Sequence, residues 1–428
     1  MNTAIVKIWG KTVGAVAYDD TKGEASFEYE KAFVDSGLQL APIKMPLNKG
    51  RIYNFPELVR TETFKGMPGL LADVLPDKYG NTLINTWLAR QGRPSNSLNP
   101  VETLCFIGKR GMGALEFEPI TPKTSNNATR ISIENLVQTA QDILSERKDF
   151  STQLNSEEER AMMDMLKIGT SAGGARAKAI IAYNPLTKEV KSGQTNAPEG
   201  FSHWLIKFDG VSQQQLVDSQ GYGRVEMAYH LMAKDCGIEM SECQLLEENG
   251  RAHFMTRRFD RPNEKDKLHV QTFCALQHYD FNQLGYYSYE QLFETIRIMA
   301  LPYPQKEQLY RRMLFNIMSR NCDDHTKNFA FYMNQKGEWN FAPAYDLCYT
   351  YQPGHPWVSQ HIMSVNGKRK DFTKDDLLAV AKNIGIKKSN LIITQIADVI
   401  KNWSQYAEQC RVEIALRDTI QGTLIPYR

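Results

Sequence analysis

Residues 321–328 form a dense polar cluster with the sequence Asn-Cys-Asp-Asp-His-Thr-Lys-Asn. The cluster lies between an apolar stretch with helical spacing, 314–318, and an apolar stretch with strand character, 329–333. Its carboxylates can accept protons or bind metal ions, and its imidazole, ammonium and amide groups add donors and acceptors. Core packing does not explain so many polar groups between two apolar elements. We therefore expect this segment to carry chemistry.

The spacing within the cluster is typical of phosphoryl transfer. Asn328 lies five positions after Asp323, as in the protein-kinase pattern His-Arg-Asp-x-x-x-x-Asn. In that pattern the Asp accepts the proton of the substrate hydroxyl and the Asn holds a magnesium ion. Asp346 ends the sequence Pro-Ala-Tyr-Asp, eighteen residues after Asn328. It is a candidate for the second metal-holding carboxylate.

A glycine-rich segment at 169–178 precedes an expected strand at 179–183. Its three glycines allow backbone N–H groups to approach a phosphate closely, and Lys178 adds a positive charge. The segment does not match the Walker A pattern, so a structural glycine turn explains it at least as well when it is taken alone. For the other glycine-rich loop, 108–113, we expect a tight hairpin rather than a phosphate site.

Lys207 lies within an apolar segment, 201–208, that we expect to be a strand. A lysine there needs a partner or must reach solvent from an edge strand. Glu226 lies near the start of an expected helix at 224–235. The two residues can form the Lys–Glu pair that positions ATP phosphates in kinases. The alternative for Glu226 is a first-turn acid favoured by the helix dipole.

The composition is that of an ordinary globular protein. The chain has 428 residues, 42% hydrophobic and 23% charged, and this length predicts two or three domains. A net charge of +2 gives no global reason to expect nucleic-acid binding. Seven cysteines without a Cys-x-x-Cys pair fit free thiols in a reducing compartment. Without a signal-peptide pattern or a run of ~18 apolar residues, we expect a cytoplasmic protein with no membrane contact.

The order of expected elements gives the domain organisation. Alternating apolar residues on both sides of a turn at 10–11 predict a hairpin near the N-terminus. A polar stretch at 119–130 reads as a linker, and Ser132 can cap a helix that ends near 144. Further expected helices are 288–299, with a capping box, 305–318, a helix capped at 373, and 391–419. A β-rich unit is thus followed by a mixed α/β segment and a mostly helical half.

Several motifs taken together resemble the HipA family of bacterial serine/threonine kinase toxins. Asp323, His325, Lys327 and Asn328, followed by Tyr345-Asp346, are the most specific of them. The others are Ser171-x-x-Gly174-Ala175-x-x-Lys178, Ile206-Lys207, Arg258-Phe259-Asp260-Arg261, Leu75-Pro76-Asp77 and Ile107-Gly108-x-x-x-x-Gly113.

The resemblance implies an α+β, two-lobed protein-kinase-like fold with an added N-terminal module. The implied boundaries are 1–122 for the β-rich module, 123–262 for the mixed α/β N-lobe and 263–428 for the mostly helical C-lobe. The implied cofactors are ATP and Mg²⁺. The implied partners are a HipB-like helix-turn-helix antitoxin, DNA only through that antitoxin, and a protein substrate, since known substrates of the family are aminoacyl-tRNA synthetases.

Site roles carry over by position. Asp323 corresponds to the catalytic base, and Asn328 and Asp346 correspond to magnesium ligands. Ser171, or the adjoining Thr170, corresponds to the serine that such kinases phosphorylate on themselves. The ATP contacts implied by the resemblance are Gly173, Gly174, Ala175, Arg176, Lys178, Lys207, Arg257, Phe259, Asp260, His325, Lys327, Asn328, Tyr345 and Asp346.

The sequence departs from the family pattern at two positions. Arg257 stands where some members have a hinge Glu, which affects side-chain contacts to the nucleotide. Asp324 replaces a Gly of some members, so we expect an extra negative charge beside the metals.

Three other interpretations are open. A small-molecule or lipid-headgroup kinase would use the same catalytic loop. A kinase-fold module with weak or no catalysis could act as a co-repressor with its antitoxin, although intact Asp323, Asn328 and Asp346 argue against loss of catalysis. A metal-dependent hydrolase could use Asp323, Asp324 and His325, but no His-Glu-x-x-His pattern supports it.

Overall fold

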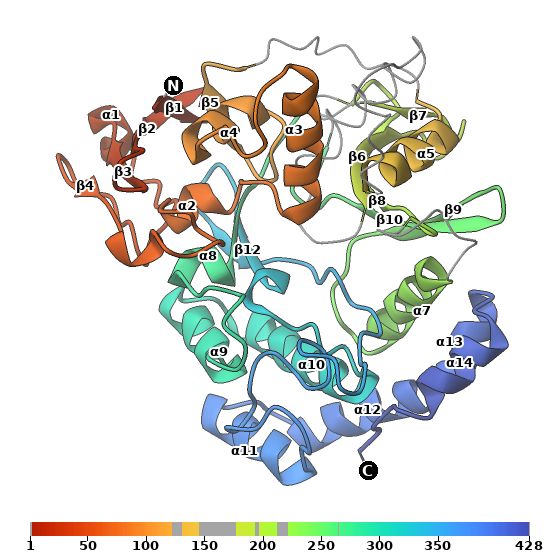
Figure 1. Cartoon of the computed structure of the whole chain (residues 1–428). Coiled ribbons are helices and arrows are strands. Elements are labelled where there is room, and N and C mark those ends of the chain that lie inside the picture. The colour runs from red at the N-terminus through yellow and green to blue at the C-terminus, as the bar shows by residue number, and fades with distance from the viewer. Residues whose placement is uncertain are drawn as a thin grey trace. The chain divides into compact units, whose positions relative to one another are not determined.

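The computed structural model describes residues 2–121, 131–144, 177–192, 197–211, 221–263 and 265–427. The chain forms two compact units, and Figure 1 labels the elements of both. Unit 1 comprises Met1–Gln220, Gln244–Gln271 and Met333–Gly337. Unit 2 comprises Gly221–Cys243, Thr272–Tyr332 and Glu338–Arg428. Both units contain helices and strands, which confirms the expected mixed α and β character.

The N-terminal part of unit 1 is built on a five-stranded antiparallel sheet with the order β4-β3-β2-β1-β5. Ala4, Val6 and Ile8 are buried in alternation along β1, so the expected N-terminal hairpin is confirmed. The strands are β1 Thr3–Ile8, β2 Lys11–Asp19, β3 Glu24–Tyr29, β4 Ile52–Tyr53 and β5 Leu115–Glu118. The helices are α1 Lys31–Asp35, η1 Pro56–Leu58, α2 Gly69–Ala72, α3 Lys78–Arg90 and α4 Pro100–Ile107.

A second five-stranded sheet follows, with the order β7-β6-β8-β10-β9. Strand β8 lies between β6 and β10, and Lys207 of β8 is opposite Lys178 and Phe254. Lys207 is therefore not on an edge strand, and that interpretation of it was wrong. The strands are β6 Lys178–Tyr183, β7 Val190–Lys191, β8 Ser202–Lys207, β9 Cys243–Glu248 and β10 Arg251–Arg257. Strand β11, His269–Thr272, is not part of this sheet.

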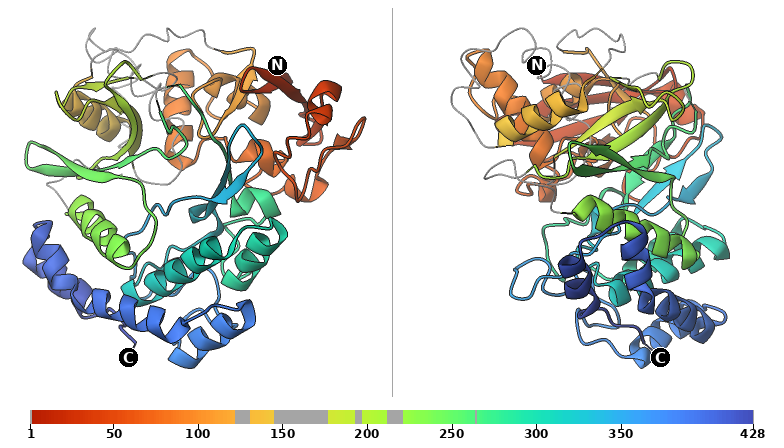
Figure 2. Two further views of the ribbon diagram at one scale, coloured as in Figure 1. Left: turned by 180° about the vertical axis from the view of Figure 1, so that it is seen from behind. Right: turned by 90° about the vertical axis from the view of Figure 1, so that its right-hand side faces the viewer.

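Two helices and one face of the second sheet share a single hydrophobic core. Helix α3 contributes Leu83 and Leu88 to it, and the sheet contributes Ile181 and Trp204. Helix α5, Ile133–Leu144, contributes Leu136 and its neighbours, and it begins after Ser132 as expected, because the Ser132 Oγ accepts from the Asn135 N–H at 3.3 Å. Figure 2 shows these elements from two further directions. The segments expected as N-terminal module and N-lobe are thus joined by one core.

A buried ionic cluster adds a second link within unit 1. The Asp260 carboxylate, fully buried, accepts from Arg258 Nε at 2.9 Å, Arg261 Nη1 at 2.7 Å and the Gly113 N–H at 2.8 Å. The Arg261 guanidinium in turn donates to the carbonyl oxygens of Gly111 and Gly113. Burial alone would raise the pKa of Asp260, but the two arginines outweigh it and hold the pKa well below its usual range.

This cluster corrects two expectations. The 108–113 loop is not a hairpin, because it connects α4 to β5, and its backbone is held by the arginines. Asp260 was expected among the nucleotide contacts. Its carboxylate is instead enclosed by Arg258, Arg261 and Gly113, so we assign it a structural role and remove it from the proposed ATP contacts.

Unit 2 is mostly helical and carries a β12–β13 hairpin. The capping boxes of α9 and α11 confirm the expected starts of these helices. The segment 391–419 is helical as expected and consists of three helices, α12, α13 and α14. The elements of unit 2 are α7 Tyr222–Asp235, α8 Phe273–Gln277, α9 Tyr289–Ile298, α10 Tyr303–Ser319, η3 Thr326–Asn328, β12 Ala330–Met333, β13 Trp339–Phe341, α11 Lys374–Ile384, α12 Ser389–Lys401, α13 Trp403–Gln409 and α14 Ile414–Gln421.

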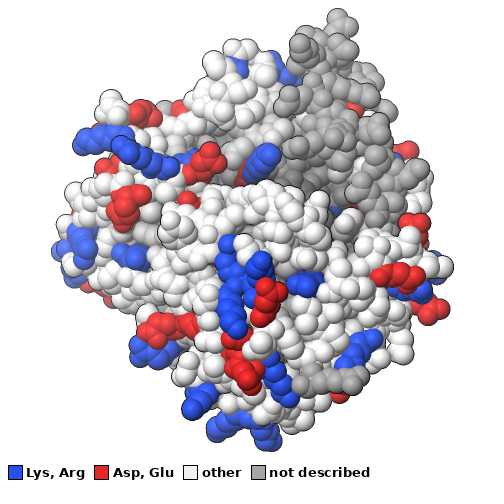
Figure 3. All heavy atoms as spheres, turned by 60° about the horizontal axis from the view of Figure 1, so that its bottom comes forward, with Lys and Arg blue, Asp and Glu red and all other residues white. Residues whose placement is uncertain are grey.

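The surface is consistent with the small net charge. On the face drawn in Figure 3, Lys and Arg side chains lie interspersed with Asp and Glu. Within the described residues, no helix combines the length and the apolar character needed to cross a membrane.

We predict that Asp260→Asn lowers the free energy of unfolding by about 3 kcal/mol, because two buried guanidinium groups lose their counter-charge. Urea unfolding followed by circular dichroism measures this change. The control is Asp266→Asn, an exposed residue of the following loop, with an expected change within about 0.5 kcal/mol. Equal effects of the two substitutions would contradict the structural role of Asp260.

Candidate active site

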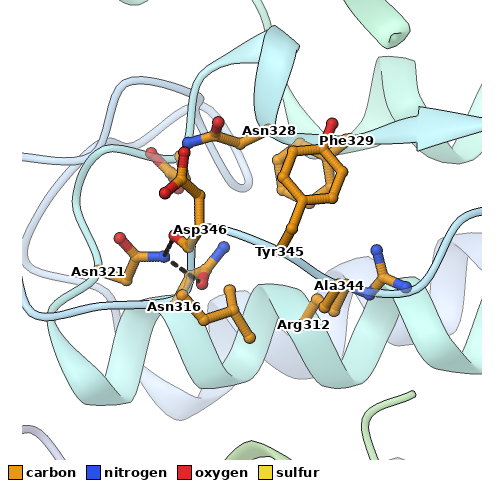
Figure 4. Close-up of a pocket in the computed structure, with 10 residues that line it drawn as sticks. Arg312, Asn316, Asn321, Asn328, Phe329, Ala344, Tyr345 and Asp346 are labelled. Atoms are coloured by element: carbon orange, nitrogen blue, oxygen red, sulfur yellow. Dashed lines mark hydrogen bonds between the residues drawn. The ribbon is translucent and has the colours of Figure 1, made fainter. Parts of the chain in front are cut away.

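The loop with the polar cluster begins where α10 ends. Arg320, the residue after α10, has a positive φ of 60°, which turns the chain away from the helix axis. The next residue, Asn321, donates through Nδ2 to Asn316 Oδ1 at 3.0 Å and to the Asp346 carbonyl at 3.4 Å. Figure 4 shows these two bonds. The start of the loop is thereby tied both to α10 and to the segment that carries the expected second metal ligand.

The two adjacent aspartates of the loop lie in opposite environments. The Asp323 side chain is 41% exposed, whereas that of Asp324 is completely buried. The Asp323 N–H donates to Thr350 Oγ1 at 3.0 Å, which fixes the backbone of the loop at this residue. Only Asp323 is therefore accessible to a substrate that approaches unit 2 from solvent.

Asp324 is the centre of a buried hydrogen-bond network. Its Oδ2 accepts from the Tyr289 hydroxyl at 2.9 Å and lies 2.8 Å from His361 Nδ1. Its Oδ1 accepts from the backbone N–H of Ile362 at 2.8 Å. Tyr289 is connected through Asn316 to the start of the loop, since Asn316 Nδ2 donates to the Tyr289 hydroxyl at 2.9 Å. The network thus joins α9, α10, the loop and residues 361–362.

The charges of this network balance. Burial alone would lower the pKa of His361, but the neighbouring Asp324 carboxylate outweighs it and raises the pKa to about 10. Burial and the same carboxylate raise the pKa of Tyr289, so its hydroxyl remains a donor. The negative charge of Asp324 is therefore compensated by His361, and the expectation of an extra charge beside the metals is corrected.

The side chains of Asn328 and Asp346 lie near one another, and each carries an oxygen atom. Asn328 Nδ2 donates to the Asp323 carbonyl at 2.6 Å, which fixes the orientation of the amide and directs its oxygen away from the loop backbone. Figure 4 shows the Asp346 side chain pointing toward that of Asn328. Asp346 has a positive φ of 57°, a conformation that non-glycine residues adopt at some cost and that is common at functional sites. Both residues line one small pocket in unit 2.

These two residues fit the requirements of magnesium. Mg²⁺ prefers hard oxygen ligands and is usually held by one or two protein groups together with water and substrate phosphates. An amide oxygen and a carboxylate suit that pattern. Across the described ranges, no group of three or more His, Cys, Asp and Glu side chains is arranged to hold a metal ion. The hydrolase interpretation is wrong for Asp324, because its carboxylate is enclosed by Tyr289 and His361.

His325 and Lys327 share one aromatic neighbour, Phe281. His325 Nε2 is 3.8 Å from Asp323 Oδ1, and the His325 ring lies 5.2 Å from the ring of Phe281. The Lys327 ammonium is 4.9 Å from the same ring, and the Lys327 carbonyl accepts from the Tyr345 hydroxyl at 2.7 Å. The loop thus brings the His325 imidazole to the exposed aspartate and places the Lys327 ammonium and the His325 ring at the same aromatic side chain.

The other expected nucleotide contacts that the structure describes, on β6, β8 and the end of β10, lie in unit 1. Lys178 and Lys207 lie side by side on β6 and β8. Arg257 ends β10, and Phe259 follows it in a half-buried turn. Gly173, Gly174, Ala175, Arg176, Ser171 and Thr170 lie outside the described residues. Lys207 and Glu226 are in different units, so their pairing stays a prediction.

Sequence reasoning missed most of the supporting residues. Tyr289, His361, Thr350 and Phe281 are 27 to 44 positions away from the loop in sequence, and no motif marks them. Tyr289 lies next to a capping box, but that motif predicts where the helix begins and not the contact of Tyr289 with the loop.

The two adjacent aspartates give a matched pair of variants. We predict that Asp324→Asn lowers the free energy of unfolding by about 3 kcal/mol, because a buried His361 cation loses its counter-charge. Asp323→Asn should change it by less than about 0.5 kcal/mol, because that side chain is largely solvated. Urea unfolding of both variants measures the difference. A stable Asp324→Asn protein would contradict the buried ion pair.

The raised pKa of His361 makes stability depend on pH. The folded pKa is about 10 and the unfolded pKa is about 6.5, so the folded state binds more protons between these values. The contribution of His361 is complete below about pH 6.5 and is lost as the pH rises toward 10. Urea unfolding across this range should show a steeper loss for the parent protein than for His361→Asn. Parallel curves for the two proteins would disprove the charged state of His361.

Comparisons with known proteins identify the family of this chain. Residues 4–118 match the model of the HipA N-terminal domain, and residues 170–404 match that of the HipA-like C-terminal domain. A Shewanella oneidensis HipA, solved in complex with HipB and operator DNA, has the same fold, with a TM-score of 0.68, 18% identity, and coverage of 98% of this chain and 94% of that one.

Two curated relatives are similar in sequence over part of their length. "Putative kinase Y4mE" of Sinorhizobium fredii is 26% identical over 36% of this chain and 39% of its own length. A "Putative kinase" of Haemophilus influenzae is 22% identical over 41% of this chain and 60% of its own length. The chain thus spans less than two-thirds of either relative. The family model that covers residues 170–404, more than half of the chain, nevertheless shows that this protein belongs to the HipA-like family.

Proposed function

We propose that this protein is an ATP-dependent serine/threonine protein kinase that acts as the toxin of a toxin–antitoxin pair. The observation that carries the proposal is the contrast between the two loop aspartates. Asp324 is buried and neutralised by His361, whereas Asp323 is exposed beside Asn328 and His325. An exposed carboxylate held by a rigid loop, next to two oxygen ligands for a metal, is the arrangement that phosphoryl transfer uses.

In the proposed reaction, the substrate hydroxyl oxygen attacks the γ-phosphorus of ATP. The bond from this phosphorus to the β–γ bridging oxygen breaks, ADP leaves, and the hydroxyl proton passes to the Asp323 carboxylate. Magnesium, held by Asn328 and Asp346, would neutralise phosphate charge in this site. Lys178, Lys207 and Lys327 would supply further positive charge.

The remaining contacts are proposals from the family. Arg257 and Phe259 would flank the nucleotide, and Tyr345 and His325 would support the phosphate side. The segment 173–176 would bind phosphates, and Ser171 or Thr170 would be phosphorylated by the protein itself. A phosphate there adds a charge of about −1.5 to −2, which would repel ATP phosphates and turn the kinase off.

The proposed partner is a HipB-like antitoxin, since the similar Shewanella oneidensis protein was solved with HipB and operator DNA. DNA would be reached only through this antitoxin. The proposed substrate is a bacterial protein such as an aminoacyl-tRNA synthetase, and the proposed location is the cytoplasm.

We predict that Asp323→Asn lowers phosphate transfer from ATP by about 10²- to 10⁴-fold, because the substrate hydroxyl loses its base. Incubation of the purified protein with γ-labelled ATP measures autophosphorylation, and addition of cell lysate measures transfer to other proteins. The control is Asp375→Asn, an exposed carboxylate in the first turn of α11, which should keep full activity.

Three outcomes separate the alternatives. Full activity of Asp323→Asn would refute the assignment of the base. Labelled small molecules without labelled proteins would indicate a small-molecule kinase. A parent protein that transfers no phosphate would indicate a binding module. Phosphoproteomics of cells that express the parent or Asp323→Asn would then identify the protein substrate.

A further inference from the structure

An ion pair within unit 1 connects the two family domains. Lys178, only 2% exposed, has its ammonium nitrogen 3.7 Å from Asp77 Oδ2. Asp77 lies in the part that matches the HipA N-terminal domain, and Lys178 lies in the part that matches the C-terminal domain. One domain thus supplies the carboxylate and the other supplies the lysine that we propose for ATP binding.

The position of the Asp77 carboxylate is fixed by the fold. Asp77 is the N-cap of α3, and its Oδ1 accepts from the Gly80 N–H at 2.9 Å. The helix that follows is held in the core it shares with the second sheet, through residues such as Tyr79 and Leu83. The second carboxylate oxygen is thereby directed at Lys178 by a rigid element.

The surroundings of Lys178 require a negative charge. Lys178 lies directly opposite Lys207 in the register of β6 and β8, and like charges in opposite positions destabilise a sheet. A buried ammonium is also costly unless it is paired. Asp77 offsets both effects at Lys178, because its carboxylate lies 3.7 Å from the ammonium nitrogen.

We propose that Asp77 is a positioning residue of the nucleotide site, which holds Lys178 charged and oriented toward the ATP phosphates. This inference rests on the proposed kinase function. It makes the N-terminal domain a part of the nucleotide site itself.

A double-mutant cycle tests the ion pair without any nucleotide. Asp77→Asn keeps the helix cap, because Asn is as good an N-cap as Asp, and removes only the charge. Lys178→Met keeps a long unbranched side chain, one atom shorter than that of lysine, and removes the charge. Urea unfolding of the two single variants and the double variant should show a coupling of about tenfold in the unfolding equilibrium constant. Additive effects would overturn the pair and, with it, the inference.

Nucleotide titration tests the positioning role. With Mg²⁺ and a fluorescent ATP analogue, Asp77→Asn should bind about tenfold more weakly than the parent and raise the KM for ATP more than it changes kcat. Asp77→Glu should recover part of the affinity. The control is Asn99→Ala, which removes the cap of α4 in the same domain and should leave nucleotide affinity unchanged.

The outcomes distinguish the two proposals. If the parent binds the analogue and Asp77→Asn binds it equally well, the positioning role is wrong and the kinase function stands. If the parent binds no nucleotide, the proposed kinase function is wrong and the positioning role falls with it.

Discussion

The site in unit 2 depends on a carboxylate that has no access to water. Burying Asp324 is tolerable only because His361, Tyr289 and the Ile362 N–H supply a charge and donors around it. These partners come from distant parts of the sequence, so the loop adopts its folded structure only when several elements have packed together. Asp323 is the residue directly before Asp324, so the contacts that fix Asp324 also restrict the position of Asp323. A fixed base is what phosphoryl transfer requires, since most of its catalysis is positioning.

In unit 1, the two family domains are bound by contacts of different kinds. Helix α3 shares a hydrophobic core with the second sheet. The Asp260 cluster fastens the backbone at Gly111 and Gly113. The carboxylate of Asp77 reaches the lysine of β6. Apolar contacts supply the larger part of such an association, and the ionic contacts fix its geometry. The sequence boundary between the two family domains therefore does not separate two independent structural units within unit 1.

The sequence allowed most elements of the fold to be predicted, because periodicity and caps are local signals. The strands β6 and β8 and the helices α9 and α10 were expected near their observed positions. The segment 391–419 is helical as expected, but the breaks between its three helices, at Asn402 and Arg411, carry no Gly or Pro and so gave no local signal.

For the site, the spacing of Asp323 and Asn328 pointed to the loop. It could not tell an exposed aspartate from a buried one, because burial depends on residues such as Tyr289 and His361 that are remote in sequence. The structural role of Asp260 was missed for the same reason, since its backbone partner Gly113 lies 147 positions earlier. The shared core also bears on synthesis. The α3 residues of this core, such as Leu83 and Leu88, leave the ribosome about a hundred residues before Ile181 and Trp204 of the same core, so their apolar side chains stay exposed for part of translation.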